Sequence, residues 1–210
     1  MLKRLARHGR AGVLVAALAV LLGTSFTTTG ATAATVSGTM DGPEASAAVD
    51  ASGRTPFTLP HRVYVREDGS VDTIADPKAV AALRSAALEE GGCGYACDGK
   101  DPNSYVWNGS TCNDAVTVMR HDVENRYAEL RYSSRCATAW TRTCCYVRAG
   151  GFGYAANGTQ RSFVYNSQGV YFGSPVWTAM LYDAGSLTYK ACLDRILAGS
   201  GHDWACTGRF

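Results

Sequence analysis

Two histidine–aspartate pairs are the first residues in this sequence whose types and spacing could do chemistry. His121 precedes Asp122 and His202 precedes Asp203, and a histidine oriented by a carboxylate can serve as the general base of a serine hydrolase. That chemistry needs a nucleophile beside the histidine, but the sequence lacks the Gly-x-Ser-x-Gly turn that often presents one. We therefore interpret the two pairs as residues of ordinary surface loops. We predict that the protein is not an enzyme.

Acidic residues are the next candidates for chemistry. Asp98, Asp101 and Asn103 could offer oxygen ligands to calcium, but their spacing and the missing distal glutamate do not match an EF-hand loop. Aspartate and asparagine beside glycine and proline more often bond their own backbone in turns. A polymer hydrolase would need carboxylates in a cleft, and the clustered candidates are Asp98, Asp101, Asp114 and Glu129. We keep that hydrolase as an alternative and predict no metal and no cofactor.

Cysteine is the residue type with the clearest pattern. The eight cysteines are Cys93, Cys97, Cys112, Cys136, Cys144, Cys145, Cys192 and Cys206. An even number in an exported chain predicts a disulfide framework, although the sequence does not give the pairing. Neighbouring side chains of a strand point to opposite faces, so we expect Cys144 and Cys145 to pair with different partners. A zinc site at Cys93 and Cys97 is disfavoured because no histidine lies at ligand spacing.

The N-terminus is typical of an export signal. Residues 1–10 contain four basic residues and no acid, residues 11–22 are small and apolar, and Ala31-Thr32-Ala33 fits a cleavage site. The apolar run is shorter than the roughly 20 residues that span a bilayer. We therefore predict a signal peptide over residues 1–33 and a secreted, extracellular protein.

Removal of the signal changes the net charge. Four of the 20 basic residues and none of the 18 acidic residues lie in it, which leaves 16 basic against 18 acidic residues, a charge of −2. A weakly acidic chain lacks the basic footprint of a nucleic-acid binder. It also lacks a basic amphipathic helix for a membrane surface. We expect neither nucleic acid nor membrane as a partner of the mature chain.

Composition divides the mature chain into three parts. Residues 34–55 are small, polar and without periodicity, which predicts a disordered segment. Residues 56–92 form an N-terminal arm, with alternating runs at 62–66 and 71–74 around Asp68-Gly69 that predict a hairpin. Asp76-Pro77 and Gly91-Gly92 then bound a predicted helix, with Val80, Leu83, Ala87 and Leu88 on one face. The arm is too small to be stable alone, so it must dock on its own core or on another protein.

Residues 93–210 form the predicted disulfide-rich β domain. Strands are expected at 115–119, 127–132, 143–148, 161–165, 176–182 and 187–193, and a short helix at 134–140. Short β-rich runs with glycine-rich turns predict a mainly β fold, a small disulfide-stapled β-sandwich or barrel with one short helix. The arm adds its hairpin and helix.

Apolar residues of the arm are the first candidates for partner binding. Pro56 and Pro60 keep the chain extended, and an extended apolar segment can add to a sheet edge or fill a groove. We favour a partner over the arm's own domain as the place where these side chains bind. The predicted residues are Phe57, Leu59, Val63, Tyr64 and Val65.

A glycine- and asparagine-rich region over residues 150–175 supplies a second set. Exposed aromatic rings beside asparagine and glutamine suit sugars or protein partners, but they also suit cross-strand pairs in hairpins. The rings in and beside this region are Tyr154, Tyr165, Tyr171, Phe172 and Trp177, of which we predict Tyr171 and Phe172 as partner-binding residues.

Four segments in a fixed order carry a family resemblance. They are CDGKDP at 97–102, CNDAVT at 112–117, ELRYSSRCATAW at 129–140 and VWTAMLYDA at 176–184. Over residues 97 to about 193 the chain resembles the DUF2690 (YjfA-like) family of small secreted actinobacterial proteins. The resemblance implies the compartment and the fold, since the family carries no established activity. This chain departs from the family pattern in its extra cysteines and its arm.

Arm-bearing members look like the adaptor subunits of secreted streptomycete umbrella-type toxin particles. In those particles a small protein joins a repeat-built stalk to a lectin-bearing subunit. That resemblance implies other secreted proteins as partners, including a lectin-bearing subunit and a repeat-containing toxin subunit.

Three functions follow as hypotheses. The first is a secreted non-catalytic adaptor that binds one protein through its body and another through its arm. The second is a secreted peptidase inhibitor that presents residues 53–65 to a protease cleft. The third is the hydrolase that uses the clustered acids. We favour the adaptor.

Overall fold

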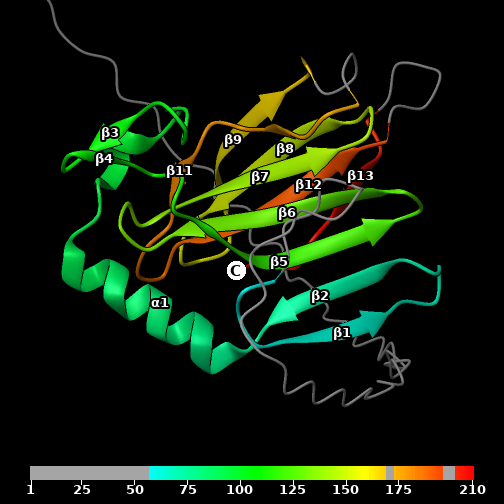
Figure 1. The fold of residues 1–210 in the computed structure, drawn as a ribbon, viewed down its shortest axis with the longest axis horizontal. Coiled ribbons are helices and arrows are strands. Elements are labelled where there is room, and N and C mark those ends of the chain that lie inside the picture. The colour runs from blue at the N-terminus through cyan, green and yellow to red at the C-terminus, as the bar shows by residue number, and fades with distance from the viewer. Residues whose placement is uncertain (1–56, 169–172, 196–201) are drawn as a thin grey trace, which may run out of the picture. The chain divides into compact units, whose positions relative to one another are not determined.

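A computed structural model describes residues 57–168, 173–195 and 202–210 of the chain (Figure 1). The predicted signal peptide, the segment 34–55, and Tyr171 and Phe172 lie outside these residues. The described residues form β1 (His61–Val65), β2 (Val71–Ala75), α1 (Pro77–Glu90), the 3-10 helix η1 (Gly94–Cys97), β3 (Val106–Trp107), β4 (Ser110–Thr111), β5 (Val116–Val123), β6 (Arg126–Ser133), β7 (Thr138–Cys144), β8 (Arg148–Tyr154), β9 (Gln160–Asn166), β10 (Val176–Trp177), β11 (Leu181–Tyr182), β12 (Thr188–Asp194) and β13 (Trp204–Cys206). The predicted mainly β fold is confirmed.

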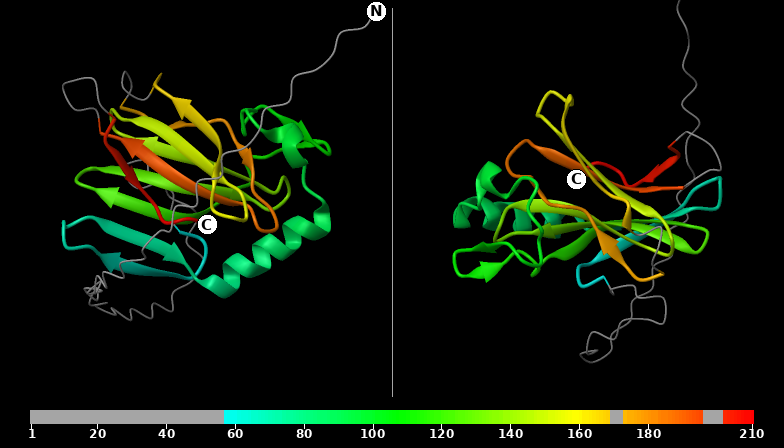
Figure 2. Two further views of the ribbon diagram at one scale, coloured as in Figure 1. Left: turned by 180° about the vertical axis from the view of Figure 1, so that it is seen from behind. Right: turned by 90° about the horizontal axis from the view of Figure 1, so that it is seen from above.

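Two antiparallel sheets face each other across the core (Figures 1 and 2). The first sheet has the order β1-β2-β5-β6-β7-β10, with β11 also paired to β7, and the second has the order β13-β12-β8-β9. Leu130 and Tyr132 of the first sheet share a buried cluster with Tyr189 and Ala191 of the second. Alternate residues of these strands therefore point inward, as the period of a strand requires. The remaining strands, β3 and β4, pair only with each other.

The predicted hairpin and helix are both present. Gly69 adopts a φ of 79° in the turn between β1 and β2, where a left-handed residue is needed. Asp76 caps α1 by accepting hydrogen bonds from the backbone N–H groups of Lys78 and Ala79, and Gly91 ends it with a φ of 79°. Ala87 is buried against the core, whereas Leu88, predicted on the same face of the helix, is 58 % exposed.

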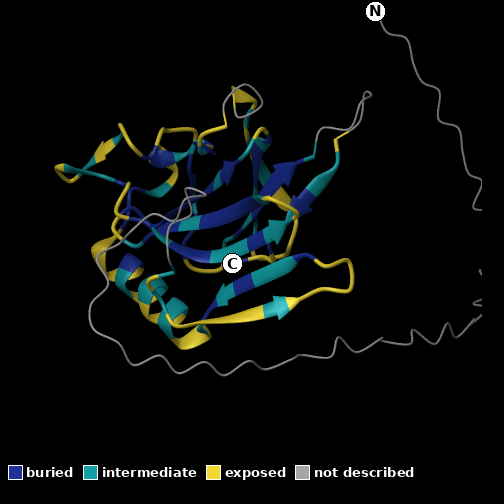
Figure 3. Ribbon diagram, turned by 45° about the vertical axis from the view of Figure 1, so that its right-hand side comes forward, coloured by how far each residue is buried: buried dark blue, intermediate teal, exposed yellow. Residues whose placement is uncertain are grey.

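The arm is part of the first sheet. Strand β2 pairs antiparallel with β5, from Val71 opposite Asp122 to Ile74 opposite Met119. Strand β1 then forms the outer edge of the sheet, and Figure 3 shows it as largely exposed. Of the two docking places considered for the arm, its hairpin and helix therefore occupy the one on their own domain.

Two predicted elements of the β domain were wrong. Residues 134–140 were expected to be helical, but Ala137 has a φ of 52° in a tight turn and Trp140 lies within β7. The backbone N–H and C=O groups of β7 are paired with β6 on one side and with β10 and β11 on the other. The single strand expected at 143–148 is interrupted: β7 ends at Cys144, β8 begins at Arg148, and the bend between them contains Cys145 and Tyr146, which both have positive φ.

The eight cysteines form four disulfides, which confirms the predicted framework. The pairs are Cys93–Cys97, Cys112–Cys136, Cys144–Cys145 and Cys192–Cys206. The expectation that Cys144 and Cys145 would pair with different partners was wrong. Cys145 leaves the strand with a φ of 77°, so the two side chains do not alternate as they would in a continuous strand. A disulfide framework fits the oxidising environment of a secreted protein. Within the described ranges, no helix is long and apolar enough to cross a membrane.

Candidate functional site

Five aromatic rings gather on the outer face of the second sheet, and we call them the aromatic surface. They are Phe152 of β8, Phe163 and Tyr165 of β9, His202, and Trp204 of β13. Phe152 lies opposite Phe163, and Gly150 lies opposite Tyr165, in the β8–β9 register. Cross-strand neighbours share a face of a sheet, so the register itself brings the rings together.

The rings contact one another closely. The centroids of Phe152 and Phe163 are 4.8 Å apart, and Trp204 meets Phe152 edge-on at 5.5 Å. Trp204 also lies within 6.1 Å of Tyr165, and His202 stacks on it at 5.5 Å. Such offset and edge-to-face pairs stabilise the arrangement beyond simple burial. The surface is still accessible, because Phe163 is 46 % and Tyr165 39 % exposed.

Glycine at position 150 makes room for Trp204. A Cβ atom at Gly150 would lie only 2.4 Å from the indole ring of Trp204, which no side chain could tolerate without displacing the ring. The disulfide between Cys192 and Cys206 joins the neighbouring strands β12 and β13 directly. The aromatic surface therefore sits on a fixed support.

His202 is oriented by a buried carboxylate at the end of β12. Its Nδ1 lies 2.7 Å from Oδ2 of Asp194, and the other oxygen of Asp194 accepts the backbone N–H of Asp203 at 3.1 Å. The sequence pattern pointed to Asp203, whose side chain instead pairs with Arg195. His121 likewise bonds Asp72 at 2.8 Å rather than its neighbour Asp122. Neither histidine is bonded to a serine, threonine or cysteine side chain of the described residues.

The His121–Asp72 pair belongs to the fold. His121 is buried, and Asp72 also pairs with Arg66 at 2.6 Å. Burial alone would raise the pKa of Asp72, but the hydrogen bonds from His121 and Arg66 outweigh it and lower the pKa below its ordinary value. This ion cluster ties the hairpin to β5.

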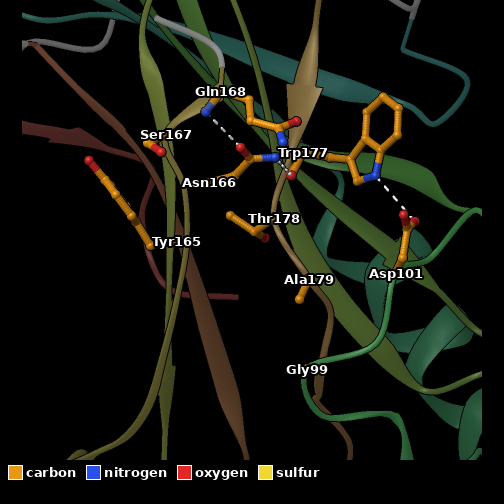
Figure 4. Close-up of a pocket in the computed structure, with 9 residues that line it drawn as sticks. All are labelled: Gly99, Asp101, Tyr165, Asn166, Ser167, Gln168, Trp177, Thr178 and Ala179. Carbon is orange, nitrogen blue, oxygen red and sulfur yellow. Dashed lines mark hydrogen bonds between the residues drawn. The ribbon is translucent and has the colours of Figure 1, made fainter.

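Two hollows flank Tyr165. The first, of about 330 Å³, is apolar and is lined by Phe152, Gln160, Phe163, Tyr165, His202 and Trp204. The second, of about 470 Å³, is more polar and runs between β9 and β10. Its lining residues, drawn in Figure 4, are Gly99, Asp101, Tyr165, Asn166, Ser167, Gln168, Trp177, Thr178 and Ala179. We call it the polar cleft.

The predicted arm residues lie in β1, at an edge of the first sheet, and just before it. Val63 and Val65 are 50 % and 69 % exposed on β1, and Tyr64 alternates with them on the same strand. Leu59 packs against the main core, and Phe57 stacks beneath the guanidinium of Arg120 at 5.5 Å. Val63 and Val65 are therefore exposed, whereas Phe57 and Leu59 help to anchor the hairpin on the domain. Their binding role stays a prediction.

The predicted acidic cluster is dispersed over structural contacts. Asp98 pairs with Arg161 at 3.0 Å and accepts the backbone N–H of Tyr182. Asp114 accepts the Ser133 hydroxyl. These contacts tie loops to strands.

Glu129 and Asp101 also have structural partners. Glu129 is fully buried and pairs with Arg142 at 2.6 Å. Its pKa is raised chiefly by burial, against the opposing charges of the nearby arginines. Asp101 accepts the backbone N–H of Asn103 at 2.8 Å, which is the expected self-bonded turn.

Three cysteine sulfurs come close enough together to resemble a metal centre. The Sγ atoms of Cys93, Cys112 and Cys136 lie within 4.8 Å of one another. Each belongs to a disulfide, and zinc requires thiolates. The cluster is therefore two adjacent disulfides in a buried region that also holds Trp140 and Met180.

Most residues of the aromatic surface were not predicted from the sequence. Tyr165 and Trp177 were among the aromatic residues considered, but Phe152, Phe163, His202, Trp204 and Asp194 were not associated with them. The alternation Gly150-x-Phe152 and Phe163-x-Tyr165 was the available signal, because residues two apart share a face of a strand.

The geometry defines a disulfide-linked, two-sheet β domain with aromatic rings displayed on one outer face. Residues 95–192 match the family described as "Protein of unknown function (DUF2690)", and this match supports the family resemblance of the motifs. No curated protein and no solved structure gives a significant match to the chain.

Proposed function

We propose that this protein is a secreted, non-catalytic adaptor whose aromatic surface docks onto another secreted protein. The observation that carries the proposal is the cluster of five partly exposed rings on one rigid sheet face. Aromatic residues in well-packed clusters supply most of the binding energy at protein interfaces. A rigid support keeps the entropic cost of binding low.

The rim of the aromatic surface suits a partner with an apolar centre. Arg148 and Asp194 pair at 3.5 Å, and Arg195 and Asp203 at 2.7 Å. Each of these pairs brings opposite charges together beside the rings, and Lys190, opposite Phe152 in the β8–β12 register, adds one positive charge. An apolar side chain of a partner can fill the 330 Å³ hollow, while its polar groups meet the rim.

An adaptor needs a second surface, and β1 supplies it. Among the described residues, β1 is an outer edge strand of the first sheet, with Val63 and Val65 exposed on one face. Exposed edges can take an added strand from a partner. In Figure 1, β1 and β9 lie at opposite ends of the molecule, so two partners could bind at once.

We further propose that the adaptor joins a lectin-bearing subunit to a repeat-containing toxin subunit of a large secreted particle. The arm-bearing chain resembles such adaptors.

Affinity purification of the mature protein from native culture supernatant tests the proposal. The tag belongs at the start of the mature chain, because Phe210 is buried under the guanidinium of Arg84. Defined partners should come down with the unchanged protein. Trp204→Ala should release one partner, and the double change Val63→Lys with Val65→Lys should release another.

Leu88→Ala is the matched control, because Leu88 is an exposed apolar residue away from both surfaces. It should retain every partner. Point changes are preferable to removal of the arm, since α1 and β2 help to form the fold. The adaptor is ruled out if the unchanged protein purifies alone, or if Trp204→Ala and the lysine double variant retain all partners.

A further inference from the structure

The polar cleft differs from the aromatic surface in its chemistry. It lies between β9 and β10 and combines two aromatic rings with amide, hydroxyl and carboxylate groups (Figure 4). Its volume of about 470 Å³ falls within the roughly 300–1,000 Å³ typical of small-molecule sites. We propose that the polar cleft is a binding site for a neutral carbohydrate. This ligand goes beyond the protein docking proposed above.

Two aromatic residues border the cleft. Figure 4 shows Tyr165 on one side and Trp177 on the other, with the Trp177 ring turned away from Tyr165 and toward Asp101. They are 39 % and 37 % exposed, so one part of each ring is accessible. The C–H faces of a sugar ring are apolar and pack well on aromatic rings, whose outer atoms stay free to bond with polar groups.

Hydrogen bonds hold Trp177 in place at the border of the cleft. The indole N–H of Trp177 donates to Oδ1 of Asp101 at 3.3 Å. The side-chain amide of Asn166 donates to the backbone oxygen of Trp177 at 2.6 Å. The same Asn166 side chain accepts the backbone N–H of Gln168 at 2.9 Å. These bonds link β9, β10 and the loop at Asp101, so the cleft is formed before a ligand enters.

Polar groups remain available for sugar hydroxyls. Among the described residues, no hydrogen bond engages Oδ2 of Asp101, the hydroxyl of Ser167 or the side-chain amide of Gln168. A carboxylate accepts, an amide both donates and accepts, and a hydroxyl does both. A polyol presents the complementary groups, each of which can donate and accept.

The charge of the lining selects a neutral ligand. Of the described residues that line the cleft, Asp101 alone is charged, and none is a lysine, arginine or histidine. Sulfated, phosphorylated or carboxylated sugars would meet a negative charge with no cation to offset it. A neutral hexose unit avoids this repulsion and can donate hydrogen bonds to Asp101.

Titration of the mature protein with soluble neutral oligosaccharides tests the inference. The panel contains glucose-, mannose- and galactose-based oligomers, with matched acidic oligomers, and isothermal titration calorimetry measures the dissociation constants. At least one neutral oligomer should bind, more tightly than its acidic counterpart. Trp177→Ala and Gln168→Ala should each weaken that binding about tenfold or more.

Leu88→Ala is the control, since Leu88 is an exposed apolar residue of α1 that lines neither hollow. It should bind the sugar as the unchanged protein does. Gln168→Ala covers the case in which Trp177→Ala alters the fold, which thermal unfolding will show. The inference is overturned if no neutral oligomer binds, if acidic oligomers bind better, or if both cleft variants bind unchanged. Each of these results leaves the capture of protein partners by the aromatic surface unaffected.

Discussion

The two sheets of this protein differ in the side chains that they display on their outer faces. The first sheet buries ionisable groups, with Glu129 fully buried in the middle of β6 and Asp183 buried just after β11. The second sheet displays aromatic rings on its outer face and supports them with glycine and a disulfide. Both sheets therefore use buried charge for internal structure, since Asp194 of β12 is also buried, but the second sheet in addition offers a rigid aromatic surface for binding.

The difference between the sheets predicts which substitutions alter stability and which alter binding. Buried ions are sensitive to the loss of a partner, because an uncompensated charge remains in a region without water. Exposed rings on a stapled sheet can change with little effect on the fold. Variants of the first sheet should mainly alter stability, and variants of the outer face of the second sheet should mainly alter binding.

The largest expected effect comes from removing the partner of Glu129. Arg142 donates from Nε to Oε2 of Glu129 at 2.7 Å, and its Nη2 lies 2.6 Å from the same oxygen. Arg142→Ala should lower the free energy of unfolding by about 3–5 kcal/mol. Denaturant-induced unfolding of the mature protein, followed by fluorescence, measures this loss.

Arg135→Ala provides the control for that change. Arg135 pairs with Asp114 at 3.4 Å, and both side chains are more than a third exposed, so its loss should cost less than about 1 kcal/mol. Equal losses for the two variants would show that burial does not distinguish the ion pairs of the first sheet.

Asp183 should make stability depend on pH. Burial raises the pKa of Asp183 to about 7 from its ordinary value of 3.8, although Arg84 at 3.5 Å opposes the shift. The folded protein then holds a proton that the unfolded chain has released, so stability should fall as the pH rises from about 4 to about 7. The loss through this group is about 4 kcal/mol at most.

Asp183→Asn should flatten that part of the profile, because asparagine does not titrate. Unfolding measured at several pH values between 4 and 8 gives the slope for each variant. Asp203→Asn is the control, since Asp203 is a third exposed in its pair with Arg195. An unchanged slope in Asp183→Asn would assign the pH dependence to other groups.

The sequence predicted the parts of the fold that depend on local signals. Asp68-Gly69 set the hairpin, and Asp76 with Gly91 set the ends of α1, because caps and turns are determined by a few neighbouring residues. The helix expected around Trp140 was wrong because pairing on both sides of β7 outweighs local preference. No sequence signal near Cys144 predicts the positive φ of Cys145. The disulfide between Cys144 and Cys145 depends on that backbone conformation.

The candidate site was harder to predict, since it is assembled from distant strands. Phe152 and Trp204 are 52 positions apart, and only the β8–β12–β13 order brings them together. Asp194 reaches His202 in the same way, whereas the sequence offered Asp203 as the nearer carboxylate. Strand order and register are long-range properties, which single-strand patterns do not contain.

The smallest of the three expected stability effects, and the sharpest test of the second sheet, comes from Gly150→Ala. The new Cβ would lie 2.4 Å from the Trp204 ring, so the ring must move away from the sheet. We expect a loss of about 1–3 kcal/mol, as for other overpacked sites, together with loss of the partner bound by the aromatic surface. Gly208→Ala is the matched control, because its Cβ would meet Met119 at 3.6 Å, an ordinary contact. If Gly150→Ala retains both the stability and the partner, the seat of Trp204 on Gly150 does not organise the aromatic surface, and the proposed division between the two sheets fails at its functional half.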